Sequence, residues 1–371
     1  MKSSRILAAT AAAALLVGPL AACSPPAKDD ASTSKASSAT SAKDAGGMGA
    51  LVKAAKKEGE LNVIALPPTW ANYGAIIKAF SDKYDIKINS AQPDGASQDE
   101  INAAKQQAGK STRPDVFDLG QSVALANVSM FAPYKVATFD EIPEQYKDAD
   151  GAWVNDYGGY MSIGYDSKKV PAITSVDDLL KSDYKGKVAL NGDPTQAGAA
   201  FSGVVMVALA EGGSADDVAP GVDFFSKLKK AGNFIPVDAT PATIESGQTP
   251  VVLDWDYLNA AETKKLPSWK VVVPFGKPVA GYYFQAINKD AVHPAAARLW
   301  EEFLYSDEGQ NLWLAGGARP VRADAMVKAG TIDKTAYAAL PAVDGEPTVV
   351  SEDQAKKATT YLSANWAKAI G

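Results

Sequence analysis

TPVVLDWDYLN, residues 249–259, is the stretch from which the fold is predicted. Its apolar run VVL, bounded by proline and polar residues, is typical of a buried strand. Side chains alternate along a strand, so Asp254 and Asp256 are expected on one face, and Trp255 and Tyr257 on the other. The following LNAAET favours a helix. These four side chains are therefore placed at the carboxyl end of a strand, where open α/β sheets bind ligands.

Two carboxylates and two aromatic rings at this position predict a pocket wall suited to a cationic ligand. A structural alternative is that Asp256 caps the helix and Trp255 belongs to the core, which leaves only Asp254 without a role. A third alternative is a secreted hydrolase that uses Asp254 and Asp256 as an acid/base pair. Neighbours on one wall do not flank a bond, which argues against catalysis, and we predict that the protein is not an enzyme.

The sequence on either side of this stretch alternates strands and helices. Apolar runs predict strands at 61–66, 86–89, 115–119, 187–190, 234–237 and 271–273, and helical patterns predict helices at 73–84, 97–108, 199–210, 222–231, 241–245 and 294–305. This order favours parallel sheets covered by helices. Two aromatic, glycine-punctuated stretches, 153–165 and 275–288, have no helical period and are expected to be extended connections between two α/β units.

Several strand-to-helix turns carry polar or aromatic side chains, and in parallel sheets such turns meet at one edge. Ser97 has the pattern of a helix N-cap, with Glu100 three residues later. Helix N-termini at this edge would favour an anionic group on the ligand. The candidate ligand-binding residues are Trp70, Ser97, Gln98, Gln121, Thr195, Gln196, Asp254, Trp255, Asp256 and Tyr257.

Composition excludes several kinds of site. The 371 residues carry a net charge of −6, which argues against nucleic-acid binding. One histidine, His293, and one cysteine, Cys23, are too few for a Ser-His-Asp triad, a multi-histidine zinc site or an internal disulfide. We therefore predict no metal and no cofactor.

The N-terminus has the features of an export signal. Residues 1–22 combine Lys2 and Arg5 with a short apolar run, and Leu-Ala-Ala-Cys at 20–23 resembles the lipobox of bacterial lipoproteins. The resemblance implies cleavage before Cys23 and a lipid on that residue. Residues 23–47 are rich in small and charged residues and are predicted to be a flexible linker.

The folded part, from about residue 51 to 322, resembles the extracellular solute-binding proteins of ABC importers, in the branch that binds iron(III), polyamines, thiamine and aminoethylphosphonate. The resemblance is carried by LVKAAKKEGELNVIALPPTWANY, PDVFDLG, YKGKVALNGDPTQ, KKAGNFIPV, TPVVLDWDYLNAA and HPAAARLWEEFLYSDEGQNLWLAGGARPVR. It implies an α/β, two-lobed, periplasmic-binding-protein-like (type II) fold whose lobes are joined by two extended crossovers. Residues 48–155 and 283–371 would form lobe 1, and residues 156–282 lobe 2.

The same resemblance implies a monomeric, lipid-anchored, extracytoplasmic protein that closes around a small polar ligand and delivers it to a membrane permease. The iron branch has adjacent tyrosines where this chain has DWDY, with only Tyr257 in place, so iron(III) is the alternative ligand. In the polyamine branch carboxylates and tryptophans bind the ligand, which fits Asp254, Trp255, Asp256 and Trp70. Thiamine phosphates and aminoethylphosphonate would match acids and helix N-termini together. A purely structural lipoprotein is a further alternative.

Overall fold

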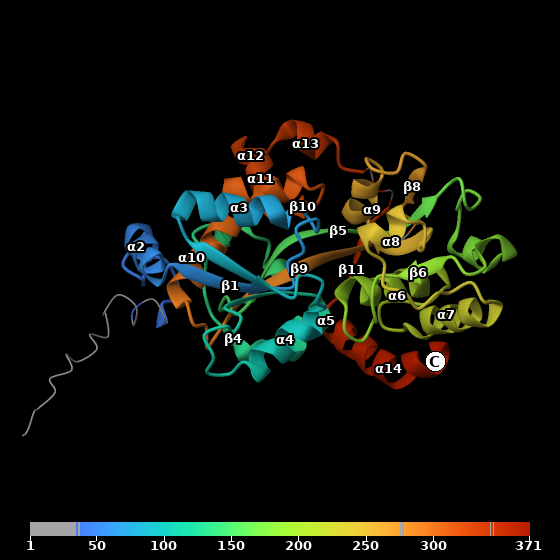
Figure 1. The fold of residues 1–371 in the computed structure, drawn as a ribbon, viewed down its shortest axis with the longest axis horizontal. Coiled ribbons are helices and arrows are strands. Elements are labelled where there is room, and N and C mark those ends of the chain that lie inside the picture. Colours follow the sequence, from blue (N-terminus) through green and yellow to red (C-terminus); the bar gives the residue numbers. More distant parts are fainter. Residues whose placement is uncertain (1–34, 36–37, 275, 277, 342, 344) are drawn as a thin grey trace, which may run out of the picture.

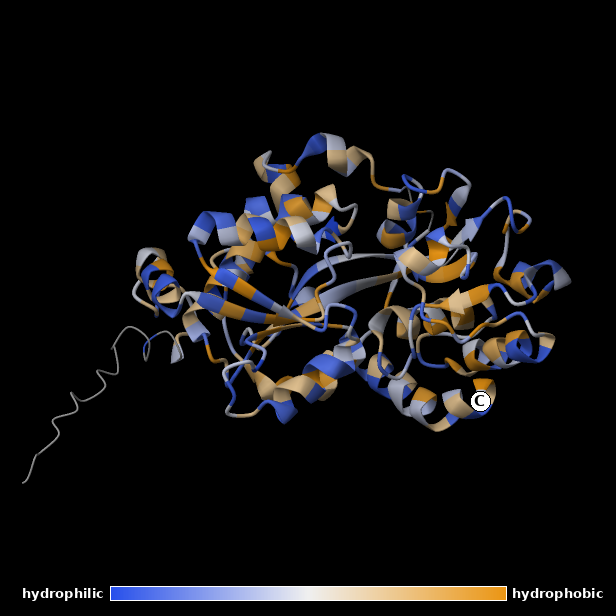
Figure 2. Cartoon of the chain, in the orientation of Figure 1, coloured by the Kyte–Doolittle hydropathy of each residue, from blue (hydrophilic) through white to orange (hydrophobic). Residues whose placement is uncertain are grey.

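The computed structural model describes residue 35 and residues 38–371, except 275, 277, 342 and 344. The predicted signal peptide and Cys23 lie outside the described residues. Two α/β lobes lie side by side along the longest axis of the molecule (Figure 1). Hydrophobic residues follow the strands and the helix faces turned toward them, whereas hydrophilic residues lie on the outer helices (Figure 2).

Lobe 1 contains the first strands and the helices that cover them. β1 pairs in parallel with β2 and lies beside β3, while β3 and β4 pair antiparallel with β9. Its elements are α2 (Met48–Glu58), β1 (Glu60–Ile64), α3 (Tyr73–Tyr84), β2 (Lys87–Ala91), α4 (Ser97–Gln106), β3 (Val116–Leu119), α5 (Gln121–Ala126), β4 (Phe131–Ala132), α10 (Pro294–Leu304), α11 (Asp307–Ala315), β10 (Arg319–Pro320), α12 (Ala323–Ala329) and α13 (Lys334–Ala338).

Lobe 2 is built on β7, which pairs in parallel with β6 and antiparallel with the second half of β5. The predicted strand at 234–237 does not form; Phe234 makes only an isolated bridge with Val188. The elements of lobe 2 are β6 (Val188–Leu190), α6 (Gly198–Ala210), α7 (Ala219–Ala231), α8 (Pro241–Glu245), β7 (Val251–Trp255), α9 (Asp256–Glu262) and β8 (Trp269–Val272).

Two long strands join the lobes, as predicted. β5 (Val154–Asp166) pairs with β9 (Val279–Asn288) through its first half, and with β7 and β8 through its second half. These pairings are antiparallel, so the expectation of parallel sheets is wrong for the strands that pair with β5, whereas β1 with β2 and β6 with β7 are parallel as expected. The parallel arrangement was expected because each strand would follow the previous one through a helix. β5 instead runs through both lobes, and the strands beside it run in the opposite direction. Both proposed lobe boundaries, near residues 155 and 282, fall inside these strands.

The C-terminal helix α14 (Glu352–Ile370) packs against both lobes rather than lobe 1 alone. It follows β11 (Thr348–Val349), which pairs with β9, and it contacts α5 of lobe 1 and α7 of lobe 2. The Trp366 ring lies 5.2 Å from the Phe225 ring, measured between centroids. Lys357 Nζ lies 2.9 Å from an oxygen of Asp216, in the turn before α7.

The end of the predicted linker contacts lobe 1. Ala39 is buried, and its carbonyl oxygen accepts a hydrogen bond of 2.8 Å from Arg298 Nε. The backbone N–H of Lys135 donates to the Thr40 carbonyl at 2.8 Å. Residues 38–47, within the range predicted as flexible, therefore belong to the folded body. No helix among the described residues is long and apolar enough to cross a bilayer.

Candidate functional site

A cavity of about 220 Å³ lies between the lobes. Lobe 1 contributes the loops after β1 and β2, the start of α4 and the end of β3; lobe 2 contributes the ends of β6 and β7 and the starts of α6 and α8. Ala65, the first residue after β1, has a φ of 55°, a left-handed conformation that is uncommon for a non-glycine residue. Strain of this kind often accompanies binding loops.

The lobes touch at two glycines beside this cavity. Gly120 follows β3 and is the N-cap of α5 in lobe 1, and Gly198 begins α6 in lobe 2. A Cβ atom placed on Gly120 would lie 2.6 Å from Gly198 Cα, and one placed on Gly198 would lie 2.7 Å from Gly120 Cα. Such a close backbone approach across the gap is possible only because neither residue carries a side chain.

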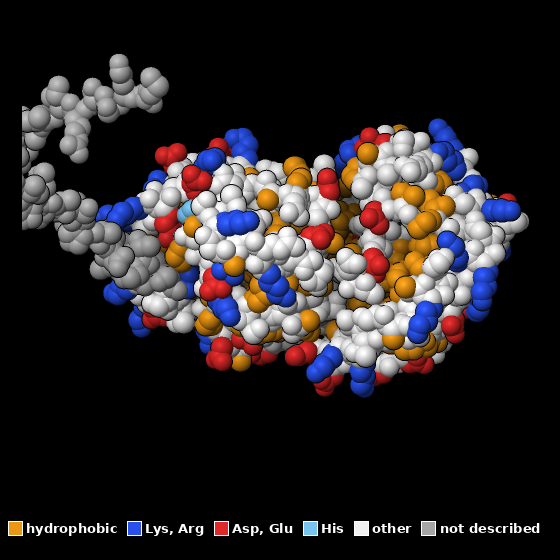
Figure 3. Space-filling view, turned by 60° about the horizontal axis from the view of Figure 1, so that its bottom comes forward, with side chains coloured by type: hydrophobic (Ala, Val, Ile, Leu, Met, Phe, Trp, Pro, Cys, Tyr) orange, Lys and Arg blue, Asp and Glu red, His pale blue; other side chains and the backbone are white. Residues whose placement is uncertain are grey.

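Acidic side chains dominate the charge of the cavity wall. Asp94 and Asp238 are exposed at its rim, whereas the wall's other four acids are buried: Glu100, Asp118, Asp254 and Glu262. Among the residues that the structure describes, the wall contains no Lys, Arg or His. Asp and Glu side chains also lie on both sides of the gap in the space-filling view (Figure 3).

Burial makes these acids weak. It raises the pKa of Asp254 to about 7, against the opposing effect of hydrogen bonds from the Trp255 backbone N–H and from Asn191 Nδ2, each 2.8 Å long. Burial likewise raises the pKa of Asp118 to about 7, although phenol hydroxyls of Tyr73 and Tyr157 favour its ionised form. The pKa of the neighbouring Glu100 lies well above its usual value through burial and the Asp118 charge.

Several buried oxygens in this wall have no hydrogen-bond partner among the described residues: Asp118 Oδ1, Asn259 Oδ1 and Glu262 Oε2. Asp118 is only 6% exposed and Glu262 only 4%. All three atoms are acceptors, and unsatisfied buried acceptors are unfavourable. Three acceptors of this wall are therefore left without a donor from the described residues.

Aromatic rings close the floor of the cavity. Trp70 and Tyr283 line it, with ring centroids 5.6 Å apart in an edge-to-face arrangement. Trp255 and Tyr257 lie behind them; Trp255 Nε1 donates to the Tyr283 hydroxyl at 3.3 Å. Faces of Trp and Tyr attract cations by about 0.5–2 kcal/mol each, depending on how dry the contact is.

Three of the residues predicted from the sequence line the cavity: Trp70, Ser97 and Asp254. Ser97 is not the N-cap as expected, because Ala96 holds that position; its Oγ instead accepts from the Gly120 backbone N–H at 2.9 Å. Glu100, expected to complete the cap, accepts from the Asp118 backbone N–H at 3.0 Å.

Asp256 does not share a wall with Asp254. The strand ends at Trp255 and a helix begins at Asp256, so the alternation of faces stops there. Asp256 is fully buried, 3.0 Å from Arg319 Nη1, and accepts from the Tyr160 backbone N–H. The two aspartates thus cannot act as an acid/base pair on one substrate.

The other predicted residues do not line the cavity either. Gln98 donates to Asn102, Gln121 Nε2 donates to the Val350 carbonyl, and Thr195 donates to Asp193. Gln196 is exposed, and Trp255 and Tyr257 are buried in the core. Gln98 and Thr195 therefore form hydrogen bonds with residues close to them in the sequence, whereas Gln121 joins its turn to a distant part of the chain.

Sequence reasoning missed the buried acids Glu100, Asp118 and Glu262, together with Tyr283. Asp118 gave a usable signal, since a carboxylate inside the apolar strand VFDL requires a partner or a function. In the described part of the chain, no three His, Cys, Asp or Glu side chains are grouped so that they could hold a metal ion.

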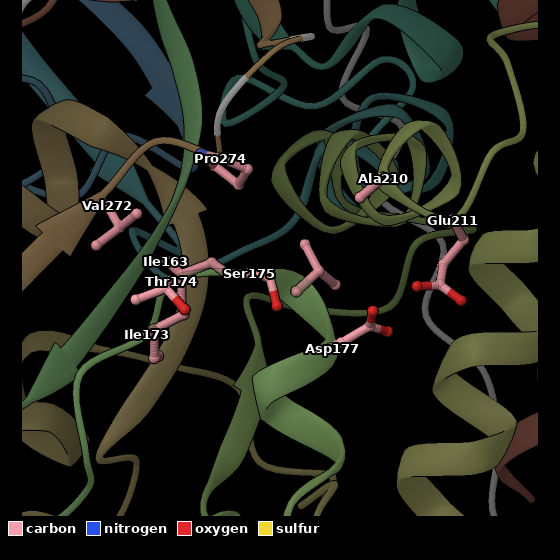
Figure 4. Close-up of a pocket in the computed structure, with 10 residues that line it drawn as sticks. Ile163, Ile173, Thr174, Ser175, Asp177, Ala210, Glu211, Val272 and Pro274 are labelled. Carbon is pink, nitrogen blue, oxygen red and sulfur yellow. The ribbon is translucent and has the colours of Figure 1, made fainter.

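A second cavity, of about 200 Å³, lies within lobe 2 (Figure 4). The carboxylates of Asp177 and Glu211 point toward each other at its edge. Burial and the Asp177 carboxylate raise the pKa of Glu211. Asp177 is exposed, and the wall contains none of the predicted site residues, so we assign no site to it.

Comparison with solved structures supports the two-lobed fold. AfuA of Actinobacillus pleuropneumoniae, solved with fructose-6-phosphate, has a TM-score of 0.66 at 18% identity over 84% of this chain and 98% of its own. Iron-bound HitA of Pseudomonas aeruginosa has a TM-score of 0.63 at 19% identity, over 84% of this chain and 99% of its own. A Listeria monocytogenes chain, provisionally assigned as a spermidine/putrescine ABC transporter, has a TM-score of 0.62 at 14% identity, over 84% of this chain and 98% of its own.

These identities show a common fold and do not choose among ligands. No curated protein sequence matches the chain. Residues 121–341, more than half of the chain, match the model of one family, described as bacterial extracellular solute-binding protein. The chain therefore belongs to the bacterial extracellular solute-binding protein family.

Proposed function

We propose that this protein captures a small amine-bearing molecule between its lobes and delivers it to the permease of an ABC importer. Solute-binding proteins of ABC transporters bind small ligands outside the cytoplasm and work with such permeases, and this chain is one of them. The amine is the specific part of the proposal. The solved structures similar to this protein are named for iron, sugar phosphate and polyamine ligands, so the choice of an amine as ligand rests on the cavity itself.

The observation that carries the amine is a wall of buried acids in which Asp118 and Asp254 have no basic partner among the described residues, and Glu262 has only Lys265 Nζ, 3.9 Å from its Oε1. Asp118, Asp254 and Glu262 are at most 6% exposed, and oxygens of Asp118 and Glu262 have no hydrogen-bond partner among the described residues. An ammonium group supplies a positive charge for Asp118 and Asp254 and N–H donors for the unpaired oxygens of Asp118 and Glu262. Trp70 and Tyr283 add ring faces for cation–π contact.

A phosphate or carboxylate group on the ligand would bind at the N-terminus of α6, away from the acidic wall. Gly198 and Ala199, the first residues of α6, line the cavity, and the N-cap residue Ala197 provides no side-chain cap. Free backbone N–H groups at a helix N-terminus favour negative charge. Amines that also carry an acidic group, such as 2-aminoethylphosphonate, therefore belong among the ligands to be tested.

Isothermal titration calorimetry of the purified soluble part, residues 38–371, with spermidine, thiamine, thiamine phosphate and 2-aminoethylphosphonate tests the proposal. We expect at least one amine to bind with a micromolar or lower Kd, and Asp254→Asn to weaken that binding by at least about 30-fold. Tight binding of Fe(III) with no heat from any amine would refute it. Mass spectrometry of compounds that co-purify with the protein gives an independent answer.

Membrane attachment through a lipid on Cys23 is the second part of the proposal and rests on the LAAC sequence at 20–23. Metabolic labelling with a palmitate analogue should label the parent protein and not Cys23→Ser. An unlabelled parent protein would contradict the anchor while leaving ligand binding untouched.

A further inference from the structure

The two carboxylate oxygens of Asp118 differ in their hydrogen-bond partners. Its Oδ2 accepts a hydrogen bond of 2.7 Å from the Tyr73 hydroxyl and one of 2.9 Å from the Tyr157 hydroxyl. Its Oδ1 is buried and has no partner among the described residues. A carboxylate oxygen has about two acceptor positions, so both positions of Oδ2 are occupied.

The direction of these two bonds is fixed by further donors. Trp70 Nε1 donates to the Tyr157 hydroxyl at 2.7 Å, and Gln285 Nε2 donates to the Tyr73 hydroxyl at 2.9 Å. Indole and amide N–H groups are donors only, so each phenol oxygen receives one hydrogen bond. The single proton of each phenol is then directed to Asp118. The two tyrosines come from α3 and from the crossover strand β5, and both side chains are fully buried.

We infer that Tyr73 and Tyr157 are positioning residues that make Asp118 a receptor for an ammonium group and not for a guanidinium group. This inference rests on the proposed function and narrows the class of ligand. An ammonium is a compact donor that binds a single oxygen well. A guanidinium presents a planar fork whose two parallel N–H groups match both oxygens of one carboxylate. With Oδ2 occupied, one arm of the fork faces a filled acceptor and is buried unpaired.

Asp254 on the opposite lobe does not make this distinction. Its Oδ1 accepts one bond, from the Trp255 backbone N–H, and its Oδ2 accepts one bond, from Asn191 Nδ2. Each oxygen therefore keeps one acceptor position. Discrimination between the two cations is thus assigned to Asp118, which can be tested separately from Asp254.

The test compares pairs of ligands that differ only in the cationic group. One pair is 1,4-diaminobutane and 1,4-diguanidinobutane, and the other is 2-aminoethylphosphonate and its guanidino analogue. Calorimetry on the parent protein should give a Kd at least about tenfold lower for the amine than for the guanidine of the pair that binds, because an unpaired buried N–H is unfavourable.

Tyr157→Phe removes one phenol donor and frees one acceptor position on Oδ2, while Trp70 Nε1 is near the cavity and can donate to water. The amine-to-guanidine ratio of Kd values should fall toward one in this variant. Tyr305→Phe is the matched control: Tyr305 is also buried and donates to a backbone carbonyl, that of Val154, at 2.8 Å. It should lower stability and leave the ratio unchanged. Tyr73→Phe is the second variant if Tyr157→Phe does not fold by circular dichroism.

The outcomes separate the inference from the proposed function. Equal or tighter binding of the guanidine by the parent protein overturns the inference and leaves amine capture standing. Discrimination that survives in Tyr157→Phe and Tyr73→Phe overturns the role of the phenols. Failure of every amine and guanidine to bind overturns the proposed function, and the inference with it.

Discussion

Replacement of Gly120 by alanine should keep the two lobes from closing fully. Gly120 has φ −64° and ψ 147°, a conformation open to any residue, so alanine fits lobe 1 without strain. Only the approach of Gly198 from lobe 2 opposes it, because the new Cβ would lie 2.6 Å from Gly198 Cα. Ordinary contact begins near 3.4 Å, so the lobes must separate locally by roughly 0.8 Å.

The size of the effect follows from where the clash occurs. Overpacking of this kind costs about 1–3 kcal/mol, and here it falls on the closed state alone. A penalty on the binding-competent state raises the apparent Kd by the same factor, which is about 5- to 150-fold. Gly198→Ala should behave alike, since its Cβ would lie 2.7 Å from Gly120 Cα. The double variant should be less than additive, because both substitutions disturb one contact.

Two measurements check this prediction. Calorimetry with the tightest-binding amine gives the Kd, and small-angle X-ray scattering at saturation should show a larger radius of gyration than the parent protein. Gly49→Ala is the control, since a Cβ there has no atom within 4 Å and the residue lies in helix α2. An unchanged Kd for Gly120→Ala, with the scattering curve of the closed parent protein, would refute the reasoning.

Three further predictions concern charged groups. Asp254→Asn should weaken amine binding by at least about 30-fold with little loss of stability. Asp256→Asn breaks a buried ion pair and should lower the free energy of unfolding, measured in urea, by about 3–5 kcal/mol. Equal effects of the two variants would contradict their separate roles. Burial raises the pKa of Asp118 and Asp254 to about 7, and a bound cation favours their ionised forms. Amine affinity, measured by calorimetry, should therefore rise from pH 5 to pH 8, and a flat affinity would contradict this. Between about pH 4 and 7 the empty protein binds more protons when folded than when unfolded, so its free energy of unfolding should fall over that window. The hydrogen bond with the buried Asp115 carboxylate raises the pKa of His293 above 6.5. The stabilising contribution of His293 is therefore full below about pH 6.5 and is lost as the pH rises through the raised pKa. His293→Gln should remove this pH dependence from the free energy of unfolding measured in urea, and an unaltered pH profile would contradict the prediction.

Local features of the fold could be predicted from the sequence because they depend on local patterns. Helix α3 spans Tyr73–Tyr84 as its apolar spacing indicates, and α8 spans Pro241–Glu245 behind its threonine cap. Both crossover strands were also recognised, since long aromatic stretches with glycines and no helical period suit extended chain. The pairing of these strands could not be predicted, because it depends on which distant segment lies beside them.

The candidate site was predictable only in part, for the same reason. Asp254 followed from its place at the end of a buried strand. Asp256 was misplaced by the assumption that alternation continues, and its partner Arg319 is distant in sequence. Glu100 has the spacing of a cap, and only the position of β3 beside α4 shows that it turns inward to the Asp118 backbone.

The attachment of α14 has a mechanical consequence. The adjacent strands β5 and β9 form a ribbon, and a ribbon both bends and twists easily. The C-terminal helix adds a tie away from that ribbon: Gln121 Nε2 donates to the Val350 carbonyl on the side of lobe 1, and Trp366 packs on Phe225 on the side of lobe 2. A helix attached to both lobes away from the ribbon opposes twisting of the lobes about the ribbon more than bending. The lobes should therefore open mainly by bending, and the carboxyl terminus should move together with lobe 2.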